Sequence, residues 1–252
     1  MRKCTKRSIE VYGEGVAVNY AEKCPDCNGG HEHNVEKVKS KADIPVAFYD
    51  KKYEAFNWHI YRKDNGEVID LSAQEKFINS FITDFDEWEK GGLGLYIWSH
   101  TKGSGKTFLA SCVCNELMER NAMRTKFVSA SSLLTIAQSG NRNALDQYER
   151  DPIGLLCNCK LLVIDDLGQK ETGRDWMADI LFRILDERMQ HGLVTIITSN
   201  IKMSELSVDD RIADRINRLC YPIPLPDYCV RAKEATENKV KLLNKLGLTK
   251  KG

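Results

Sequence analysis

The chain has 252 residues, which leaves room for one domain of ordinary size and a small appendage but not for two full domains. Apolar residues make up 42% of it and charged residues 29%, a composition that predicts a folded globular protein rather than a disordered one. The formal net charge of +1 argues against a surface dominated by basic residues, so any contact with nucleic acid is expected to be local.

No stretch approaches the roughly 18 apolar residues that a membrane-spanning helix needs, and no apolar signal core follows the charged start of the chain. We therefore expect a cytoplasmic protein without membrane contact. Nine cysteines is an odd number, and several fall in apolar segments, where a reduced thiol acts as a small hydrophobe: Cys112, Cys114, Cys157 and Cys159. A disulfide framework is not expected.

Residues 1–41 are polar and end in a run of charges, so we place a boundary there and expect a small partner-binding arm. The arm contains a cysteine pair with the two-residue spacing that lets both thiolates bind one tetrahedral zinc. The candidate ligands are Cys24, Cys27, His31 and His33, with Cys4 in addition. So short a segment builds little core, and zinc would supply folding free energy. The alternative is a flexible arm with free thiols.

Residues 42–70 are richer in apolar and aromatic residues, and we expect them to form a linker segment packed on the main domain. The recurring aromatic residues are Tyr53, Phe56, Trp58 and Tyr61, which are expected to lie in the core.

Residues 71–232 are expected to form the main domain. Ser72 to Glu75 fits a capping box, and the predicted helix continues to about Lys90, where a Gly-Gly pair ends it. Strand and helix patterns then alternate: strands at 93–98, 125–128, 161–165 and 194–198, and helices at 108–120, from about 131, and at 176–190. This alternation implies an α/β fold with βαβ units, a mainly parallel sheet and helices on both of its faces.

Residues 233–252 alternate basic, acidic and apolar side chains, the apolar ones including Val240, Leu242 and Leu243. The pattern predicts an amphipathic helix packed against the core, followed by a tail. A DNA-binding tail is the alternative.

A glycine-rich loop follows the strand predicted at 93–98, with the sequence Gly103-Ser104-Gly105-Lys106-Thr107. Backbone N–H groups hold nucleotide phosphates when the loop adopts conformations that glycine tolerates, and the positive end of the next helix adds to the attraction. Lys106 is expected to reach the β- and γ-phosphates and the Thr107 hydroxyl to coordinate Mg²⁺, which predicts a site for ATP with Mg²⁺. The full G-x-x-x-x-G-K-[ST] pattern would require glycine in place of His100, whose side chain could obstruct the loop.

Two acidic residues, Asp165 and Asp166, follow four apolar residues at the carboxyl end of a predicted strand. Open α/β sheets place their ligands at that edge. We expect Asp165 to hold Mg²⁺, directly or through water, and Asp166 to orient or deprotonate the attacking water. A strand end that simply enters solvent is the alternative, although unpaired carboxylates beside a buried strand carry a desolvation cost.

Polar residues also end the next predicted strand, where Asn200 closes the run Thr198-Ser199-Asn200. A side chain there could contact the γ-phosphate or the attacking water. Ser-Asn after a strand is also common in turns, so this segment carries little weight without the other two motifs.

The order of these elements resembles the AAA+ ATPases, and within them the bacterial helicase-loader family (DnaC/DnaI-like) and the related IstB transposition ATPases. The similarity covers roughly residues 44–231. Ile44 to Tyr49 is similar to a short Ile-Pro motif before the ATPase domain, Leu162 to Gly168 to the acidic motif, and the Thr198 to Asn200 run to sensor 1. The resemblance implies an AAA+ ATPase domain with a five-stranded, mainly parallel sheet.

The resemblance also assigns three arginines. The segment from Asp210 to Ile216 is similar to the one that bears the arginine finger, with Arg215 as the first candidate and Arg211 as the reserve, and Arg231 matches the sensor 2 arginine. An arginine delivered in trans stabilises charge on the transferring phosphoryl group, so hydrolysis would require stacked subunits. The alternative for each arginine is a solvated helix face or a surface ion pair. Cys229 stands where the family has serine.

The resemblance implies an ATP-hydrolysing loader, phage- or prophage-encoded, that helps place a hexameric replicative DNA helicase on single-stranded DNA during replication initiation. Its partners would be the helicase, through the arm, and single-stranded DNA, and it would self-assemble through ATP-bridged interfaces. Fold-level analogy does not fix function, and two alternatives stay open. One is a transposition helper ATPase that acts on duplex DNA with a transposase, and the other is a nucleotide-binding scaffold that has lost turnover.

Overall fold

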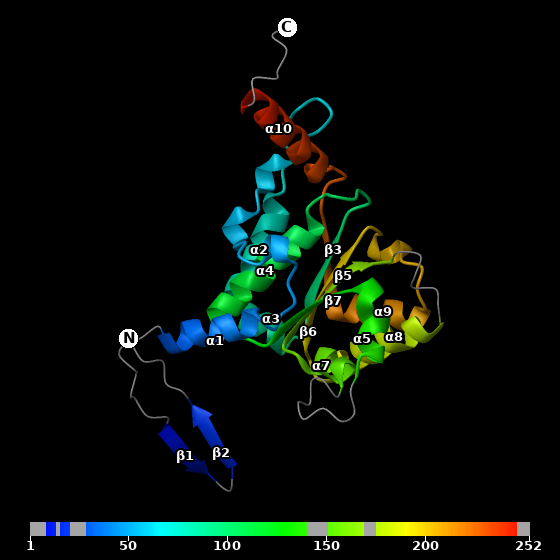
Figure 1. Cartoon of the computed structure of the whole chain (residues 1–252). Helices are drawn as coiled ribbons and strands as arrows, with labels where there is room; N and C mark the ends of the chain where they lie inside the picture. The colour runs from blue at the N-terminus through cyan, green and yellow to red at the C-terminus, as the bar shows by residue number, and fades with distance from the viewer. Residues whose placement is uncertain (1–8, 14–15, 21–28, 141–150, 169–174, 246–252) are drawn as a thin grey trace.

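The computed structural model describes residues 9–13, 16–20, 29–140, 151–168 and 175–245. At the centre of the described part is a parallel sheet in the order β4-β5-β6-β3-β7 (Figure 1). Its five strands are β3 (Gly94–Trp98), β4 (Thr125–Ser129), β5 (Leu161–Leu167), β6 (Val194–Ser199) and β7 (Cys220–Pro224). The expected α/β fold with a five-stranded, mainly parallel sheet is confirmed.

The strand β7 is not among the strands predicted from the sequence. It contains two prolines, Pro222 and Pro224, which lack the N–H that a central strand needs. The structure places β7 at an edge of the sheet, paired with β3, where proline is tolerated. Its assignment therefore depends on tertiary pairing rather than on a local pattern.

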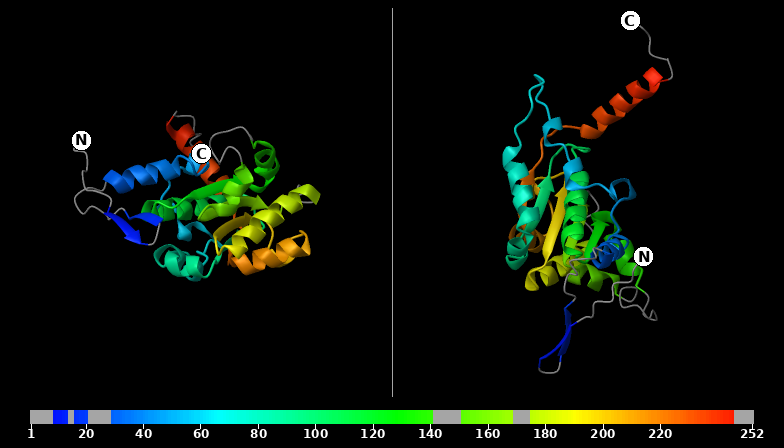
Figure 2. Two further views of the ribbon diagram at one scale, coloured as in Figure 1. Left: turned by 90° about the horizontal axis from the view of Figure 1, so that it is seen from below. Right: turned by 90° about the vertical axis from the view of Figure 1, so that its left-hand side faces the viewer.

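Helices cover both faces of the sheet (Figure 2). The first face carries α1 (Gly29–Lys39), α2 (Ser72–Thr83), α3 (Phe85–Lys90) and α4 (Lys106–Asn121); the second carries α5 (Leu133–Gln138), α7 (Pro152–Asn158), α8 (Asp175–Gln190) and α9 (Asp210–Leu219). Side chains of a strand alternate between the two cores, so Leu95 and Ile97 pack in the first and Tyr96 in the second.

The helix predicted to run from residue 72 to about Lys90 is two helices, α2 and α3, which meet at Asp84. The Asp84 carboxylate accepts hydrogen bonds from the hydroxyls of Ser80 and Thr83, which stabilises the helix end there. The expected capping box is also wrong: the N-cap is the residue before Ser72, and the Ser72 backbone N–H donates to the Asp70 carboxylate instead.

The segment 42–70 wraps the first face in three short 3-10 turns, η1 (Val46–Phe48), η2 (Tyr53–Ala55) and η3 (Trp58–Ile60). Phe56, Trp58 and Tyr61 are buried in the core beside α4. The side-chain amide of Asn115 on α4 donates to the backbone carbonyls of Phe48 and Lys51, each at 2.9 Å. The segment is therefore tied to the helix that follows the glycine-rich loop.

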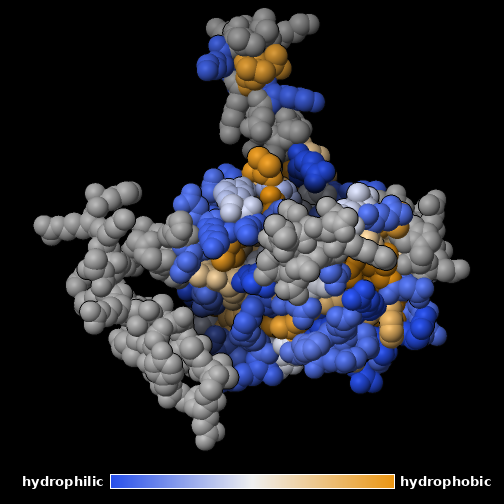
Figure 3. Space-filling model, turned by 60° about the horizontal axis from the view of Figure 1, so that its bottom comes forward, coloured by the Kyte–Doolittle hydropathy of each residue, from blue (hydrophilic) through white to orange (hydrophobic). Residues whose placement is uncertain are grey.

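The last helix, α10 (Val230–Lys245), projects from the body of the protein (Figures 1 and 2). The expectation that its apolar side packs against the core is wrong, because Val240, Leu242 and Leu243 are 47%, 56% and 41% exposed. Figure 3 shows this apolar surface on the projecting element at the top of the view. The helix carries five basic residues, Arg231, Lys233, Lys239, Lys241 and Lys245, against two acidic ones, Glu234 and Glu237. The alternative of a DNA-contacting tail therefore stays open.

The N-terminal arm contains an antiparallel hairpin of β1 (Ile9–Gly13) and β2 (Val16–Tyr20). Cys4, Cys24 and Cys27 lie outside the described residues, and the side chains of His31 and His33 in α1 are not described, so zinc stays a prediction. In the described ranges no group of three or more His, Cys, Asp or Glu side chains could hold a metal ion.

Four of the cysteines expected in apolar segments, Cys112, Cys114, Cys157 and Cys159, are buried free thiols. Within the described part of the chain, no helix has the length and apolar character needed to cross a membrane.

Candidate nucleotide-binding site

The glycine-rich loop joins β3 to α4 and depends on two glycines with positive φ. Gly103 has φ 77° and Gly105 has φ 96°, a region that other residues rarely adopt. A Cβ atom at Gly103 would lie 3.1 Å from the Arg231 Cβ, and one at Gly105 would lie 3.2 Å from the Tyr61 hydroxyl. The backbone conformation therefore favours glycine at both positions, and any side chain there would also push its neighbours aside by a few tenths of an ångström.

Lys106, the first residue of α4, is 7% exposed and points its ammonium into the loop. The Nζ atom donates to the carbonyls of Ser99 and Thr101, at 3.2 and 2.9 Å, and to the Ser104 hydroxyl at 3.1 Å. Burial lowers the pKa of Lys106 from its ordinary value to about 8, while the nearby carboxylates of Asp165 and Asp166 act in the opposite direction.

Asp165 accepts hydrogen bonds from the hydroxyl groups of two threonines. The Thr107 hydroxyl donates to its Oδ1 atom at 2.9 Å, and the Thr198 hydroxyl donates to the same oxygen at 2.6 Å. Burial raises the pKa of Asp165, and the two hydroxyl donors oppose this by stabilising the carboxylate. The helix α4 and the neighbouring parallel strands β5 and β6 thus bring oxygen atoms to one point, as expected for the carboxyl edge of an open sheet.

The Asp166 side chain has other partners than Asp165, and the strand β5 is irregular at this residue. The register with β6 shifts between Ile164 and Leu167, and Asp166 has φ 60°, which is uncommon for a residue other than glycine. Its backbone N–H donates to the Thr198 hydroxyl at 2.9 Å, and its Oδ1 atom accepts a 2.6 Å hydrogen bond from the Asn200 side-chain amide. Strain of this kind is concentrated at functional sites.

The loop and the acidic residues face one cavity of about 860 Å³, within the range typical of ligand sites. The predicted site residues that line it are Gly103, Ser104, Gly105, Lys106, Thr107, Asp165, Asp166, Asn200 and Arg231. Ala47 and Phe48 from the linker segment supply an apolar wall, and Phe108 lies beside them. The cavity therefore has a polar end, formed by the loop and the acidic residues, and an apolar side.

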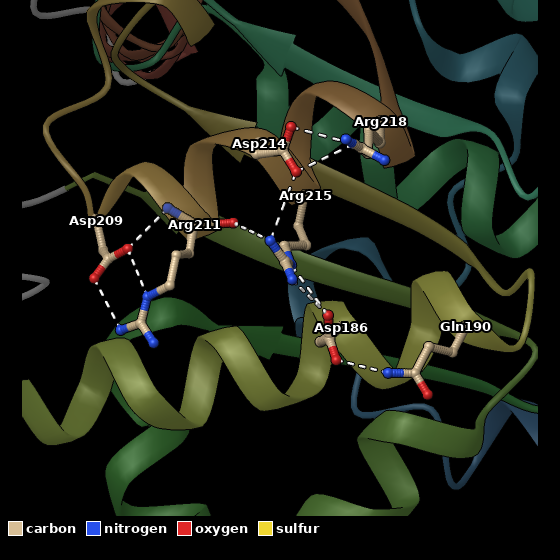
Figure 4. Close-up of polar contacts among 7 residues, drawn as sticks. All are labelled: Asp186, Gln190, Asp209, Arg211, Asp214, Arg215 and Arg218. Carbon is tan, nitrogen blue, oxygen red and sulfur yellow. Dashed lines mark hydrogen bonds and ion pairs between the residues drawn. The ribbon is translucent and has the colours of Figure 1, made fainter.

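The predicted arginines divide between two places. Arg231 lies at the cavity, and its backbone N–H donates to the Gly103 carbonyl at 3.2 Å. Arg215 and Arg211 do not line this cavity, because they lie on α9 against α8 (Figure 4). There Arg215 bonds to Asp186, and Arg211 forms an ion pair with Asp209 at 3.0 Å.

Two further residues hold the loop and were not singled out as site residues from the sequence. The Tyr61 hydroxyl donates to the Ser104 carbonyl at 2.8 Å. The Asp227 carboxylate, in the connection between β7 and α10, accepts from the Ser99 hydroxyl at 3.0 Å and from the Thr101 backbone N–H at 3.1 Å. No sequence motif marks them, because each contact joins residues more than forty positions apart.

His100 does not obstruct the loop. Its side chain is exposed and packs edge-on against the Trp98 ring, with ring centroids 5.2 Å apart, and it does not line the cavity. The side chain that replaces the glycine of the full motif at position 100 therefore leaves the loop open.

The donor set fits Mg²⁺ and a triphosphate. A hard cation prefers carboxylate and hydroxyl oxygens, and Thr107 and Asp165 present these 2.9 Å apart. The Lys106 ammonium and the N-terminus of α4 supply positive charge beside them.

Comparison with known proteins agrees with this geometry. A family model described as IstB-like ATP binding protein matches residues 97–234. The replicative helicase loader DnaI of Bacillus subtilis (strain 168) is 29% identical over 232 residues, which cover 82% of this chain and 71% of that protein. The replicative helicase loader DnaC of Escherichia coli (strain K12) is 28% identical over 153 residues, and the match covers 60% of this chain and only 58% of that protein.

The fold also occurs in solved structures. A crystal structure of DnaI superposes with a TM-score of 0.57 at 24% identity, covering 73% of this chain and 96% of that one. The expected resemblance to AAA+ proteins of the DnaC/DnaI type is confirmed. Since the family model matches more than half of its length, the chain belongs to the IstB-like ATP-binding proteins.

Proposed function

We propose that this protein binds and hydrolyses ATP with Mg²⁺ and uses it to help place a hexameric replicative helicase on single-stranded DNA. The observation that carries the ATPase part is the meeting of the Lys106 loop, the Thr107–Asp165–Thr198 hydrogen bonds and the Asp166–Asn200 pair in one cavity. The loader part is supported by the names of the two curated relatives, both replicative helicase loaders.

Each residue has a distinct proposed role at this site. Thr107 and Asp165 would hold Mg²⁺, which supplies charge neutralisation for the phosphates. Lys106 and the loop amides bind the β- and γ-phosphates. Asp166 orients or deprotonates the attacking water, and Asn200 fixes the Asp166 carboxylate through its 2.6 Å hydrogen bond. Arg231, which lies on α10, contacts the phosphates.

We propose the following division of the chain. Residues 71–232 form the ATPase domain, and residues 42–70 complete the wall of its cavity. Residues 1–41 contact the helicase, with zinc bound by the cysteine pair, and residues 233–252 supply the basic helix and tail. Metal analysis of the purified protein tests the zinc, and the absence of zinc in stoichiometric amounts would contradict that part alone.

The ATPase proposal is tested by hydrolysis in the presence of single-stranded DNA and a candidate helicase. Lys106→Ala should strongly weaken nucleotide binding, whereas Asp166→Asn should keep binding and lose turnover, because Asp166 acts on water rather than on the phosphates. If the unmodified protein binds ATP but never exceeds the rates of the two variants, the protein is a scaffold without turnover.

The loader proposal is tested with the partner. The protein is mixed with a hexameric replicative helicase from the same genome and with Mg-ATP, and the complex is sized. A complex that forms with the helicase and delivers it onto single-stranded DNA supports the proposal. Assembly on duplex DNA with a transposase, and no complex with the helicase, would favour the transposition alternative.

A further inference from the structure

Tyr61 reaches the phosphate-binding loop from behind. It follows the short turn η3, lies 43 positions before Ser104 and is fully buried, and it does not line the cavity. Its ring is held between Phe56, with centroids 6.5 Å apart, and Tyr228, at 6.0 Å. The hydroxyl donates a 2.8 Å hydrogen bond to the Ser104 carbonyl.

This hydrogen bond fixes the direction in which the Gly105 N–H points. The Ser104 carbonyl and the Gly105 N–H belong to one planar trans peptide, so they point in opposite directions. Because the carbonyl is turned toward the buried Tyr61, the Gly105 N–H is turned the other way, toward the cavity that Gly105 lines. Glycine restricts φ less than other residues do, so this peptide can turn unless a partner holds it; in the structure Gly105 has φ 96°.

We propose that Tyr61 is a positioning residue for the phosphate-binding loop: its hydroxyl fixes the Ser104–Gly105 peptide so that the Gly105 N–H faces the bound phosphates. The inference rests on the proposed nucleotide site and assigns part of its affinity to a residue outside the motif. Burial raises the pKa of Tyr61, so the hydroxyl keeps its proton and stays a donor.

The same contact links the segment 42–61 to nucleotide binding. Asn115 on α4 donates to the Phe48 and Lys51 carbonyls, and Tyr61 donates to the Ser104 carbonyl, so the segment is tied both to α4 and to the loop that precedes it. Binding free energies are reciprocal: if an ordered segment favours bound phosphates, then bound phosphates order the segment.

The experiment uses Tyr61→Phe in the full chain, which keeps the ring and removes only the donor. We expect Mg-ATP and magnesium tripolyphosphate to bind about tenfold more weakly, by the same factor, because the lost contact orients an amide that binds phosphate rather than the nucleoside. Mg-ATP should also slow amide hydrogen exchange of residues 53–61 in the parent and less so in the variant.

Tyr96→Phe is the matched control. Tyr96 is also fully buried, and its hydroxyl also donates to a backbone carbonyl at 2.8 Å, that of Ile201. The Tyr96→Phe variant should lose about as much thermal stability as Tyr61→Phe. It should keep its Mg-ATP affinity within about twofold, because Tyr96 does not touch the loop.

Three outcomes would overturn the inference. In the first, Tyr61→Phe keeps its Mg-ATP affinity within about twofold while Lys106→Ala loses binding. The proposed nucleotide site would then stand, and only the role of Tyr61 would be wrong. Equal affinity losses in Tyr61→Phe and Tyr96→Phe would show that general destabilisation is the cause. Unchanged affinity in Lys106→Ala would overturn the proposed nucleotide site, and this inference with it.

Discussion

Arg215 on α9 is bound to Asp186 on α8, with its Nη2 atom 2.9 Å and its Nε atom 3.1 Å from the same carboxylate oxygen (Figure 4). The Arg215 guanidinium also lies over the Phe182 ring, 4.6 Å from the centroid, and its side chain is 22% exposed. To act on a nucleotide in a neighbouring subunit, Arg215 would have to leave this pair. The Arg211 guanidinium also lies over the Phe182 ring, 4.9 Å from the centroid, and the Arg211 side chain is 58% exposed.

The first prediction separates a trans-acting arginine from a clamp between the two helices. Arg215→Ala and Asp186→Ala should each lower the free energy of unfolding by about 1 kcal/mol, because each breaks the same ion pair. Only Arg215→Ala should also abolish the concentration-dependent part of ATP hydrolysis. Chemical denaturation and steady-state hydrolysis over a range of protein concentration provide the two measurements.

If Asp186→Ala and Arg215→Ala lose hydrolysis equally, Arg215 serves only to join α8 and α9. The reserve candidate is then examined with Arg211→Ala, which removes an ion pair with Asp209 and a contact with the Phe182 ring at an exposed side chain and should change stability little.

The second prediction concerns pH and Lys106. Burial lowers the pKa of Lys106 to about 8, so the ammonium of the free protein is protonated at neutral pH and loses its proton as the pH rises above about 8. A triphosphate binds the protonated form better, so the dissociation constant of Mg-ATP should increase between pH 8 and pH 9.5, and binding there should take up a proton. Calorimetry in buffers of different ionisation enthalpy measures both. Lys106→Ala should bind weakly at every pH, and a parallel loss in that variant would mean that another group titrates.

The third prediction concerns the hydrogen bond that the Thr198 hydroxyl donates to Asp165. Thr198→Val removes a donor that favours the carboxylate, so the pKa of Asp165, already raised by burial, should rise further. Hydrolysis should then need more Mg²⁺, and the acidic limb of its pH profile should move to higher pH. Thr198→Ser keeps the hydroxyl and should restore both properties. A profile of Thr198→Val that coincides with the parent would exclude this role.

The fourth prediction compares two arginines on α8. Arg188 is fully buried and donates to the carbonyls of Leu156, Cys159 and Val194 and to the Thr195 hydroxyl. Arg188→Leu should cost about 3–5 kcal/mol of unfolding free energy, because it leaves these buried acceptors without a donor.

The control is Arg183→Ala on the same helix. Arg183 is 53% exposed and pairs with Glu187 one turn away, so its removal should cost less than about 1 kcal/mol. Urea denaturation of both variants is the measurement. A cost for Arg188→Leu as small as that for Arg183→Ala would mean that the interior rearranges to satisfy the carbonyls.

Much of the fold was predictable from local pattern. Apolar runs and the glycine breaks marked the strands β3, β4, β5 and β6 and the helices α4, α5 and α8, because periodicity is a property of neighbouring residues, whereas the short helix α7 was missed. The break at Asp84 and the edge strand β7 were missed, since the first depends on side-chain bonds at a helix end and the second on pairing with β3. The packing of α10 was predicted wrongly, because an amphipathic pattern does not identify the surface that covers it.

The sequence by itself identified the residues of the proposed site: two glycines, a lysine, a threonine and two carboxylates follow predicted strands, and a parallel sheet gathers the carboxyl ends of its strands at one edge. Only the tertiary structure decided which residues hold that chemistry in place. The Tyr61 hydroxyl and the Asp227 carboxylate each form hydrogen bonds to backbone groups of the loop that are distant in the sequence. Such partners are brought together by the order of strands and the layering of helices, which no local stretch of residues encodes.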